Sequence, residues 1–246
     1  MGFVGVTVFA PLRVARQGLS GGETISPAQL GRTLCTEVAE QVPYWVAVLT
    51  PAERPLLDAR SASGRSEQAS VTLELPQSHH RPHALLLAAL GSAVCTWQRN
   101  NRRGSSAGVL VDLDLDATNA VHPVRLPAVH TDALAVPAHG KNLVDDVARK
   151  LDSVPNGGRD YALTRNYPAL ASRAGAQIIV RDHTSTEPKD GYAIDVRITV
   201  TDAGTAAARV SWAGELQGVD ELIRLWWVAV HHLTTMATAA TGSSAA

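Results

Sequence analysis

The sequence is poor in cysteine, in aromatic side chains and in excess charge. Only two cysteines occur among the 246 residues. Cys95 lies inside the apolar run 84–95, where a reduced core thiol is expected rather than half of a disulfide. With 22 basic and 23 acidic residues, the formal net charge is −1. The chain therefore lacks the excess of basic residues that binding to a nucleic-acid phosphate backbone needs. We therefore expect no nucleic-acid partner, and a reducing cytoplasm is the expected location.

Long uninterrupted apolar segments are also lacking. The run 84–95 is too short to cross a bilayer, and the later stretch LIRLWWVAVHHL is broken by Arg224, His231 and His232. At the start of the sequence the basic residues follow the apolar run instead of preceding it, and no clear cleavage site is present. A short strand or a loosely anchored leader is therefore favoured over a signal peptide. These features predict a soluble protein with no membrane partner.

Several catalytic signatures are missing as well. Gly157-Gly158 follows a helix C-terminus, where carbonyl groups repel anions, and no Lys-Ser or Lys-Thr comes after it, so a P-loop is excluded. No GxSxG motif occurs. His79, His80 and His83 form a cluster, but no cysteine or carboxylate lies at ligand spacing. We therefore predict no metal site.

Hydrophobic residues make up 45% of the chain, enough for a substantial core. Their periodicity alternates between that of helices and that of strands. Helices that interleave with strands and are followed by three late strands favour a mixed sheet covered by helices. The expected helices are 27–42, 82–97, 142–154 and 220–237, and the expected strands are 70–76, 108–116, 176–182, 192–202 and 207–214, with a short extended piece at 122–129.

Residues 58–68 are small, polar and without periodicity, which predicts a linker and a boundary near residue 60. The expected organisation is an N-terminal segment with one helix at 1–60, a main body at 61–238, and a disordered tail at 239–246.

Two polar clusters invite a catalytic interpretation, and each also has a structural one. His231-His232 copies the first two residues of an HHxxxDG motif, but Met236 stands where the aspartate is needed, so a plain surface pair is expected. The alternation of Asp112, Asp114 and Asp116 with apolar residues directs all three carboxylates to one side of a strand. They could hold a cation or act as a base, yet any strand with one wet face alternates in this way.

Several stretches resemble the C-terminal lobe of condensation and epimerization domains of nonribosomal peptide synthetases. VPYWVAVL at 42–49 is similar to the segment before the inter-lobe linker, and PHALLLAALGSAVCTW at 82–97 is similar to the DLLLxALxxALxxW helix. Residues 212–233 are similar to the closing strand and helix. Residues 154–165 are similar to the VPxxGxGYGLLR stretch of epimerization domains, in which the matching residues here are Val154, Pro155, Gly158, Tyr161, Leu163 and Arg165, while Asp160 and Ala162 replace two glycines.

This resemblance, which covers roughly residues 40–237, implies an α/β fold of the α+β two-layer type. It implies one chloramphenicol acetyltransferase-like lobe, with a mixed, mostly antiparallel sheet covered by helices. In the family two such lobes form a V, and the phosphopantetheine arms of carrier proteins enter the tunnel between them. The resemblance therefore implies no bound cofactor, with the phosphopantetheine arm as a possible ligand. The family's histidine base lies on an N-terminal lobe, and no such lobe precedes residue 40.

The resemblance also implies the candidate site residues. Asp114 aligns with the catalytic glutamate of the EGHGR motif, although the rest of that motif is replaced at 115–118. Tyr161 and Arg165 are the candidate substrate-binding residues. The family's RTVGWFTxxYPV segment is missing here except for something like His122-Pro123-Val124. The family's FNYLG strand corresponds to residues 177–181, without its polar and aromatic residues.

Proton transfer at an α carbon needs a base and an opposed acid within reach of the same atom, and this chain supplies at most one of them. Asp114 is also one methylene shorter than the glutamate it replaces. We therefore expect a degenerate, stand-alone half domain that is a non-catalytic structural or carrier-protein-interaction module. Its expected partner is a carrier protein or a synthetase N-terminal lobe.

Two alternatives stay open. The first is an acyltransferase that completes its cleft by self-association as a homo-oligomer, specifically a trimer, with His122, His130 or His139 as the base. The second is a decayed gene product without a retained role. A lone lobe must also replace or cover the face its partner would bury, and the charged residues Asp116, Arg181 and Asp182 favour replacement by polar side chains.

Overall fold

A computed structural model describes residues 36–53, 56, 66–74, 81–101, 107–115, 120–182, 189–200, 205–214 and 216–242. The expected leader, the start of the first helix and the boundary near residue 60 lie outside these residues. Within the described part of the chain, no helix is long and apolar enough to cross a membrane.

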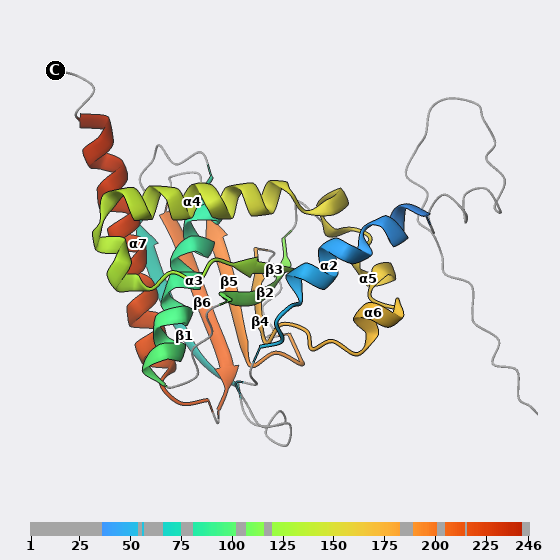
Figure 1. The fold of residues 1–246 in the computed structure, drawn as a ribbon. Coiled ribbons are helices and arrows are strands. Elements are labelled where there is room, and N and C mark those ends of the chain that lie inside the picture. Colours follow the sequence, from blue (N-terminus) through green and yellow to red (C-terminus); the bar gives the residue numbers. More distant parts are fainter. Residues whose placement is uncertain are drawn as a thin grey trace, which may run out of the picture.

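The centre of the fold is a six-stranded mixed sheet in the order β1-β6-β5-β4-β2-β3 (Figure 1). The neighbours β1 and β6, β6 and β5, and β2 and β3 are antiparallel, whereas β4 is parallel to both β5 and β2. The α/β class and the mixed, mostly antiparallel sheet are thus confirmed. The strands are β1 Ser66–Glu74, β2 Val109–Asp114, β3 His122–Leu126, β4 Ile178–Arg181, β5 Ile194–Val200 and β6 Thr205–Ala213.

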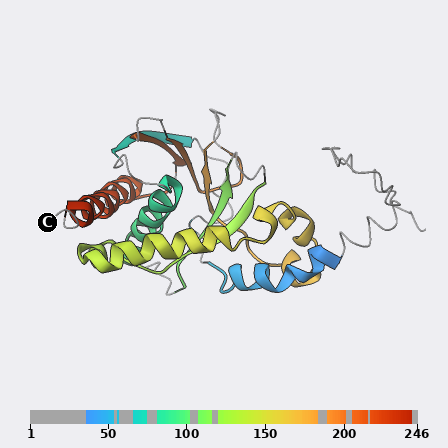
Figure 2. The same cartoon turned by 90° about the horizontal axis from the view of Figure 1, so that it is seen from above.

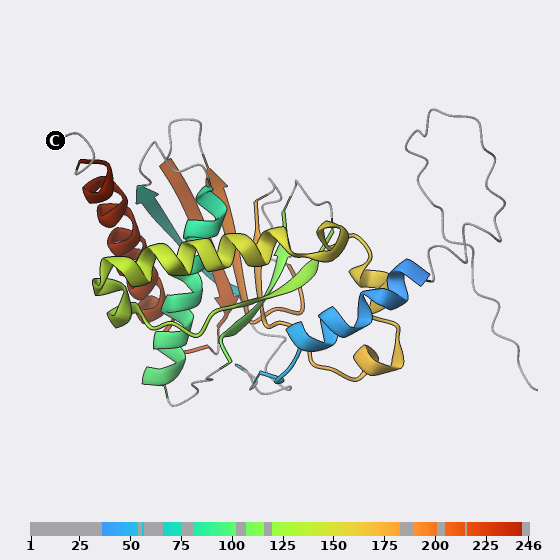
Figure 3. The ribbon, with the colours of Figure 1, turned by 45° about the horizontal axis from the view of Figure 1, so that its top comes forward.

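Three long helices, α3, α4 and α7, pack together on one face of this sheet (Figure 2). We call the face turned away from them the outer face. The short helices η2, α5 and α6 lie beyond the β3 edge, near α2 (Figure 3), whereas η1 packs against α3, α4 and α7. The helices are α2 Val42–Val48, α3 Pro82–Asn100, η1 Thr131–Ala135, α4 Pro137–Asp152, η2 Pro155–Gly158, α5 Tyr161–Thr164, α6 Pro168–Ala171 and α7 Val219–Gly242.

Helix α3 is the central element of the core. Proline at its first position fits a helix start, because the missing N–H needs no partner there. Every residue from Ala84 to Gln98 is buried. Gly91 lets β3 approach closely, since a Cβ there would lie 2.9 Å from the Leu126 Cβ. On the other side, the Trp226 indole of α7 donates a hydrogen bond to the Leu86 carbonyl at 3.1 Å.

The segment around α2 is fastened to the β3 edge by polar contacts. Arg125 donates hydrogen bonds to the carbonyls of Val48 and Pro51, each at 2.8 Å. The Glu53 carboxylate accepts a hydrogen bond from the backbone N–H of Leu110, and burial raises the pKa of that carboxyl group. Residues 42–53 therefore contribute to the same body as the sheet.

Some element boundaries differ from the sequence expectation. β1 begins at Ser66, inside the stretch read as a linker, because its pairing with β6 stabilises residues that carry no apolar pattern. Helix α4 begins at Pro137, five residues early, and α7 continues to Gly242, into the expected tail. Proline at position 137 fits a helix start, so α4 begins there and not at the later amphipathic stretch.

Candidate functional site

The sheet register places Asp112 and Asp114 on the outer face. Val109 is paired with Leu126, the residue that contacts Gly91 of α3, so the odd-numbered residues of β2 face the helices. The two aspartates therefore point the other way, as the alternation predicted, and Asp116 lies outside the described residues. Asp112 is in register with Ile179 of β4, and Asp114 with Arg181.

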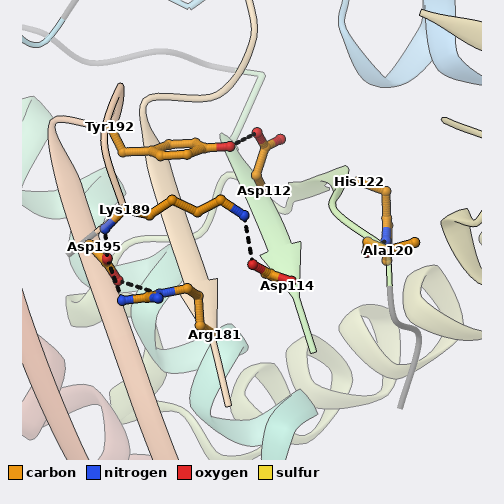
Figure 4. A network of polar contacts seen from close by, with 8 residues as sticks. All are labelled: Asp112, Asp114, Ala120, His122, Arg181, Lys189, Tyr192 and Asp195. Carbon is orange, nitrogen blue, oxygen red and sulfur yellow. Dashed lines mark hydrogen bonds and ion pairs between the residues drawn. The ribbon is translucent and has the colours of Figure 1, made fainter. Parts of the chain in front are cut away.

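Both carboxylates are engaged by side chains from the segment that leads into β5 (Figure 4). The Tyr192 hydroxyl donates a hydrogen bond to Asp112 Oδ2 at 2.7 Å. Lys189 Nζ forms an ion pair with Asp114 Oδ2, also at 2.7 Å, with side-chain exposures of 38% and 17% respectively. A lysine and a phenol thus lie over the carboxylates of β2.

A buried arginine–aspartate pair anchors this segment. Arg181 donates through Nε to Asp195 Oδ1 at 3.0 Å and through its terminal nitrogen to Oδ2 at 2.7 Å. The side chains of the pair are only 3% and 5% exposed. The backbone N–H of Lys189 donates to the same Asp195 oxygen, Oδ2, at 2.6 Å, which fixes where the lysine begins. We call these six residues the outer-face network: Asp112, Asp114, Arg181, Lys189, Tyr192 and Asp195.

Burial sets the protonation behaviour of this network. It raises the pKa of Asp112, and the hydrogen bond from Tyr192 and the positive charges of Lys189 and Arg165 oppose the rise. Burial, together with the charge of Asp112, raises the pKa of Tyr192 far above its ordinary value. The phenol therefore stays protonated and remains a hydrogen-bond donor to Asp112.

The structure places Tyr161 and Arg165 beside the β2–β3 end of the sheet. The Tyr161 ring lies 4.8 Å from the Trp45 ring of α2, measured between centroids, and burial raises its pKa. Arg165 donates hydrogen bonds to the carbonyls of Leu170 and Arg173, which close the turn of α6. These contacts hold the local fold, and the substrate-binding roles of both residues stay a prediction.

The stretch between α4 and α5 makes a tight left-handed turn. Asn156, Gly157 and Gly158 have φ values of 47°, 59° and 81°. Asp160, which replaces a glycine of the epimerization pattern, accepts hydrogen bonds from Gln41 Nε2 at 2.8 Å and from Asn156 Nδ2 at 2.9 Å. Asp160 therefore links the turn to Gln41, the residue before α2, and also closes the turn through Asn156.

Gly158 also makes room for His122. A Cβ on Gly158 would lie 2.2 Å from His122 Nδ1, closer than two such atoms can approach. His122 is 2% exposed, its Nδ1 lies 3.1 Å from the Ala120 carbonyl, and burial lowers its pKa. A neutral, packed imidazole results.

The two other candidate histidines lie together. His130 and His139 line a pocket of about 380 Å³ with Asn142 and Asp146 of α4. The Nδ1 atom of His130 is buried with no hydrogen-bond partner. His122 is not among the lining residues, so the structure groups His130 with His139 and separates both from His122.

Sequence reasoning missed Lys189, Tyr192 and Asp195. No local signal was available, because Asp195 alternates with apolar residues together with Arg197 and Thr199, as on any strand with one wet face. Which partner it has depends on β4 lying beside β5, and the sequence pattern did not contain that. Across the described ranges, no group of three histidine, cysteine, aspartate or glutamate side chains is arranged to hold a metal ion.

The similarity of this chain to known proteins lies in its three-dimensional structure. No family model matches the sequence, and no curated protein matches it. Among solved structures, the epimerization domain from the third module of tyrocidine synthetase B is similar, with a TM-score of 0.57 and 18% sequence identity, over 89% of this chain and 60% of that one.

Two other solved structures show the range of similar proteins. One is the wax ester synthase/diacylglycerol acyltransferase from Marinobacter aquaeolei VT8, with a TM-score of 0.53 and 11% identity, over 82% of this chain and 56% of that one. The other is a cyclization-docking bidomain of a nonribosomal peptide synthetase from Sorangium cellulosum, with a TM-score of 0.56 and 10% identity, over 82% and 48%.

These likenesses confirm the fold that the sequence resemblance implies. The chain spans between 48% and 60% of the length of the three proteins. At identities this low, the likeness carries the arrangement of helices and strands and leaves the chemistry to be argued from the residues of this chain.

Proposed function

We propose that this chain, whose fold is that of condensation and epimerization domains, acts as a non-catalytic structural or carrier-protein-interaction module of nonribosomal peptide synthesis. The observation that carries the proposal is the ion pair between Lys189 Nζ and Asp114 Oδ2 at 2.7 Å. The ion pair engages the carboxylate that the sequence resemblance aligns with the family's catalytic glutamate.

The other groups at this end of the sheet favour the same interpretation. A general acid or base must lie within hydrogen-bond reach of the proton it transfers. Asp112 accepts a hydrogen bond from Tyr192, and His122 is buried, with its Nδ1 beside a backbone carbonyl. Asp112 and His122 Nδ1 are thus each engaged by another group of the protein. We expect such contacts where a former catalytic site has a structural role.

The non-catalytic part of the proposal is tested by following the α proton of a peptidyl thioester in deuterated buffer. The full chain is mixed with an isolated synthetase N-terminal lobe. We expect background exchange for the wild type and the same rate for Asp114→Asn. Exchange above background that Asp114→Asn abolishes, while the exposed control Asp145→Asn retains it, overturns this part.

The interaction part of the proposal rests on the two-lobe architecture and phosphopantetheine delivery that the resemblance implies. Calorimetry with a phosphopantetheine-loaded carrier protein, and separately with a synthetase N-terminal lobe, is the direct test. We expect saturable binding to one of them. Absence of binding to both contradicts the proposal.

A self-associating acyltransferase is the alternative, and one observation favours it. His130 and His139 share a pocket, and the Nδ1 atom of His130 is buried there without a hydrogen-bond partner. This alternative requires a trimer whose activity is lost in His130→Ala or His139→Ala. A monomeric mass by light scattering counts against it.

A further inference from the structure

Helix α7 lies at the end of the molecule opposite α2 (Figures 1 and 2) and carries one exposed stripe. Between Val219 and His231, the exposed residues are Asp220, Arg224, Trp227 and His231. Because residues three and four apart are neighbours on a helix surface, these four side chains share one side of α7. We call them the α7 stripe.

The centre of the stripe is an aromatic side chain that the core does not use. Trp227 is 51% exposed, whereas its neighbour Trp226 is 1% exposed. The Trp227 ring stacks on the His231 ring, with 5.6 Å between centroids and 3° between the planes. This contact orients the indole while half of its surface stays in solvent. Tryptophan is enriched at the centres of protein interfaces, where it contributes much of the binding energy.

The stripe is complementary to a second copy of itself. Steps of four, three and four residues are those of the a and d positions of a heptad, along which two helices pack. When the two helices run antiparallel about a two-fold axis, Arg224 faces Trp227 of the second copy. Asp220 then faces His231 of the second copy. The symmetry makes each of these contacts twice.

Both contacts join groups that attract each other. A guanidinium group stacks on the face of an indole through a cation–π interaction, and an imidazole N–H donates a hydrogen bond to a carboxylate. In a parallel pairing, Asp220 and Arg224 would each face the same residue of the second copy, and the like charges would repel. Charge complementarity therefore favours the antiparallel arrangement.

We propose that the α7 stripe is the interface of a homodimer in which two α7 helices pack antiparallel about a two-fold axis. One helix from each copy forms a small interface, so the association is weak and depends on protein concentration. The dimer does not use the outer-face network and does not depend on the function proposed above. It also differs from the trimer that the acyltransferase alternative requires.

Sedimentation velocity of the full chain over a series of concentrations measures the association. The mass of the wild type should rise from that of one chain to that of two. Trp227→Ala should weaken the association at least about tenfold, because it removes the aromatic partner of Arg224. Leu163→Ala truncates an apolar side chain of α5 that is 43% exposed, and this control should associate as the wild type does.

A mass of one chain at every concentration overturns the proposal in favour of a different occupant of the stripe, and a mass of three chains overturns it in favour of the trimer. An association that Trp227→Ala leaves unchanged shows that the copies meet through another surface and equally contradicts the proposal.

The pairing itself is tested by exchanging charges across the interface. Asp220→Lys removes the carboxylate that faces His231 of the second copy, and His231→Glu sets a carboxylate against Asp220, so each variant should associate several-fold more weakly. The double variant should associate more tightly than either, because opposite charges meet again. The two positions lie about 16 Å apart along one helix, so this rescue arises between chains.

Asp220→Lys also removes a carboxylate from the first turn of α7, where it favours the helix. The double variant carries the same change, so its rescue separates the interface from this local effect. A double variant that associates no more tightly than the single variants contradicts the antiparallel pairing.

Discussion

At the scale of single residues, the charged groups of the outer face differ in how deeply they are buried with their partners. Arg181 and Asp195 are almost fully buried and satisfy each other. Lys189 and Asp114 are more exposed, so solvent screens that pair and it contributes less to stability. The buried pair is therefore the more sensitive to substitution.

Asp195→Ala should lower the free energy of unfolding by about 3 kcal/mol, because it leaves the Arg181 guanidinium buried without its carboxylate. Replacing both partners, as in Arg181→Met with Asp195→Leu, should cost much less, since no uncompensated charge is buried. Urea unfolding followed by circular dichroism measures both. A double variant as unstable as the single one disagrees with this account.

The pH dependence of stability reports on Asp112. Its pKa is higher in the folded protein than in the unfolded chain, so the folded state binds the proton more tightly. The stabilisation from this group is present at acid pH and is lost as the pH rises from about 4 through the folded pKa.

An amide at position 112 does not titrate and can still accept the Tyr192 hydrogen bond. Relative to wild type, Asp112→Asn should therefore become progressively more stable as the pH is raised from about 4 to about 7. Unfolding free energies across this range measure the change. Asp145→Asn on the exposed side of α4 is the control, and an identical trend in both variants assigns the effect to general charge.

At the scale of elements, the turn between α4 and α5 is determined by one close approach. Gly158 combines a positive φ with contact against His122, whereas Gly157 also has a positive φ but nothing within 4 Å of its Cβ position. Alanine at Gly157 therefore tests backbone strain alone, whereas alanine at Gly158 tests strain and crowding together.

Gly157→Ala should lower stability by about 1 kcal/mol through its backbone conformation alone. Gly158→Ala should cost about 2–4 kcal/mol, because crowding against His122 adds to the strain. Thermal or urea unfolding of both variants measures the difference. Equal losses show that His122 moves aside without cost.

At the scale of the whole molecule, the contacts of residues 42–53 decide whether this segment unfolds together with the sheet. The Trp45 side chain is fully buried and lies beside both Tyr161 and His122. Arg125 and Glu53 add polar contacts between this segment and the sheet. Such contacts indicate one cooperative unit.

Trp45→Ala should therefore lower the stability of the whole chain by about 3–5 kcal/mol, with one transition in urea and faster amide exchange in β2 and β3 as well as in α2. Trp227→Ala, on the exposed side of α7, should change stability little. Faster exchange confined to α2, with the sheet unaffected, identifies the segment as a separate unit.

Much of this molecule follows from local pattern. The apolar run of α3 predicts a buried helix, and the alternation of β2 predicts that Asp112 and Asp114 share a face, because helix and strand periodicities are properties of neighbouring residues. Element ends were less predictable. β1 starts earlier and α7 ends later than expected, since pairing and packing extend them.

The sequence by itself determined the class of the fold, the central helix, the polar outer side of β2 and the resemblance to condensation and epimerization domains. Only the tertiary structure decided which charges meet. Lys189 reaches Asp114 across 75 positions, and Arg181 meets Asp195 because β4 lies beside β5. Strand order and register are long-range properties, set by how the whole core packs, and no local pattern encodes them.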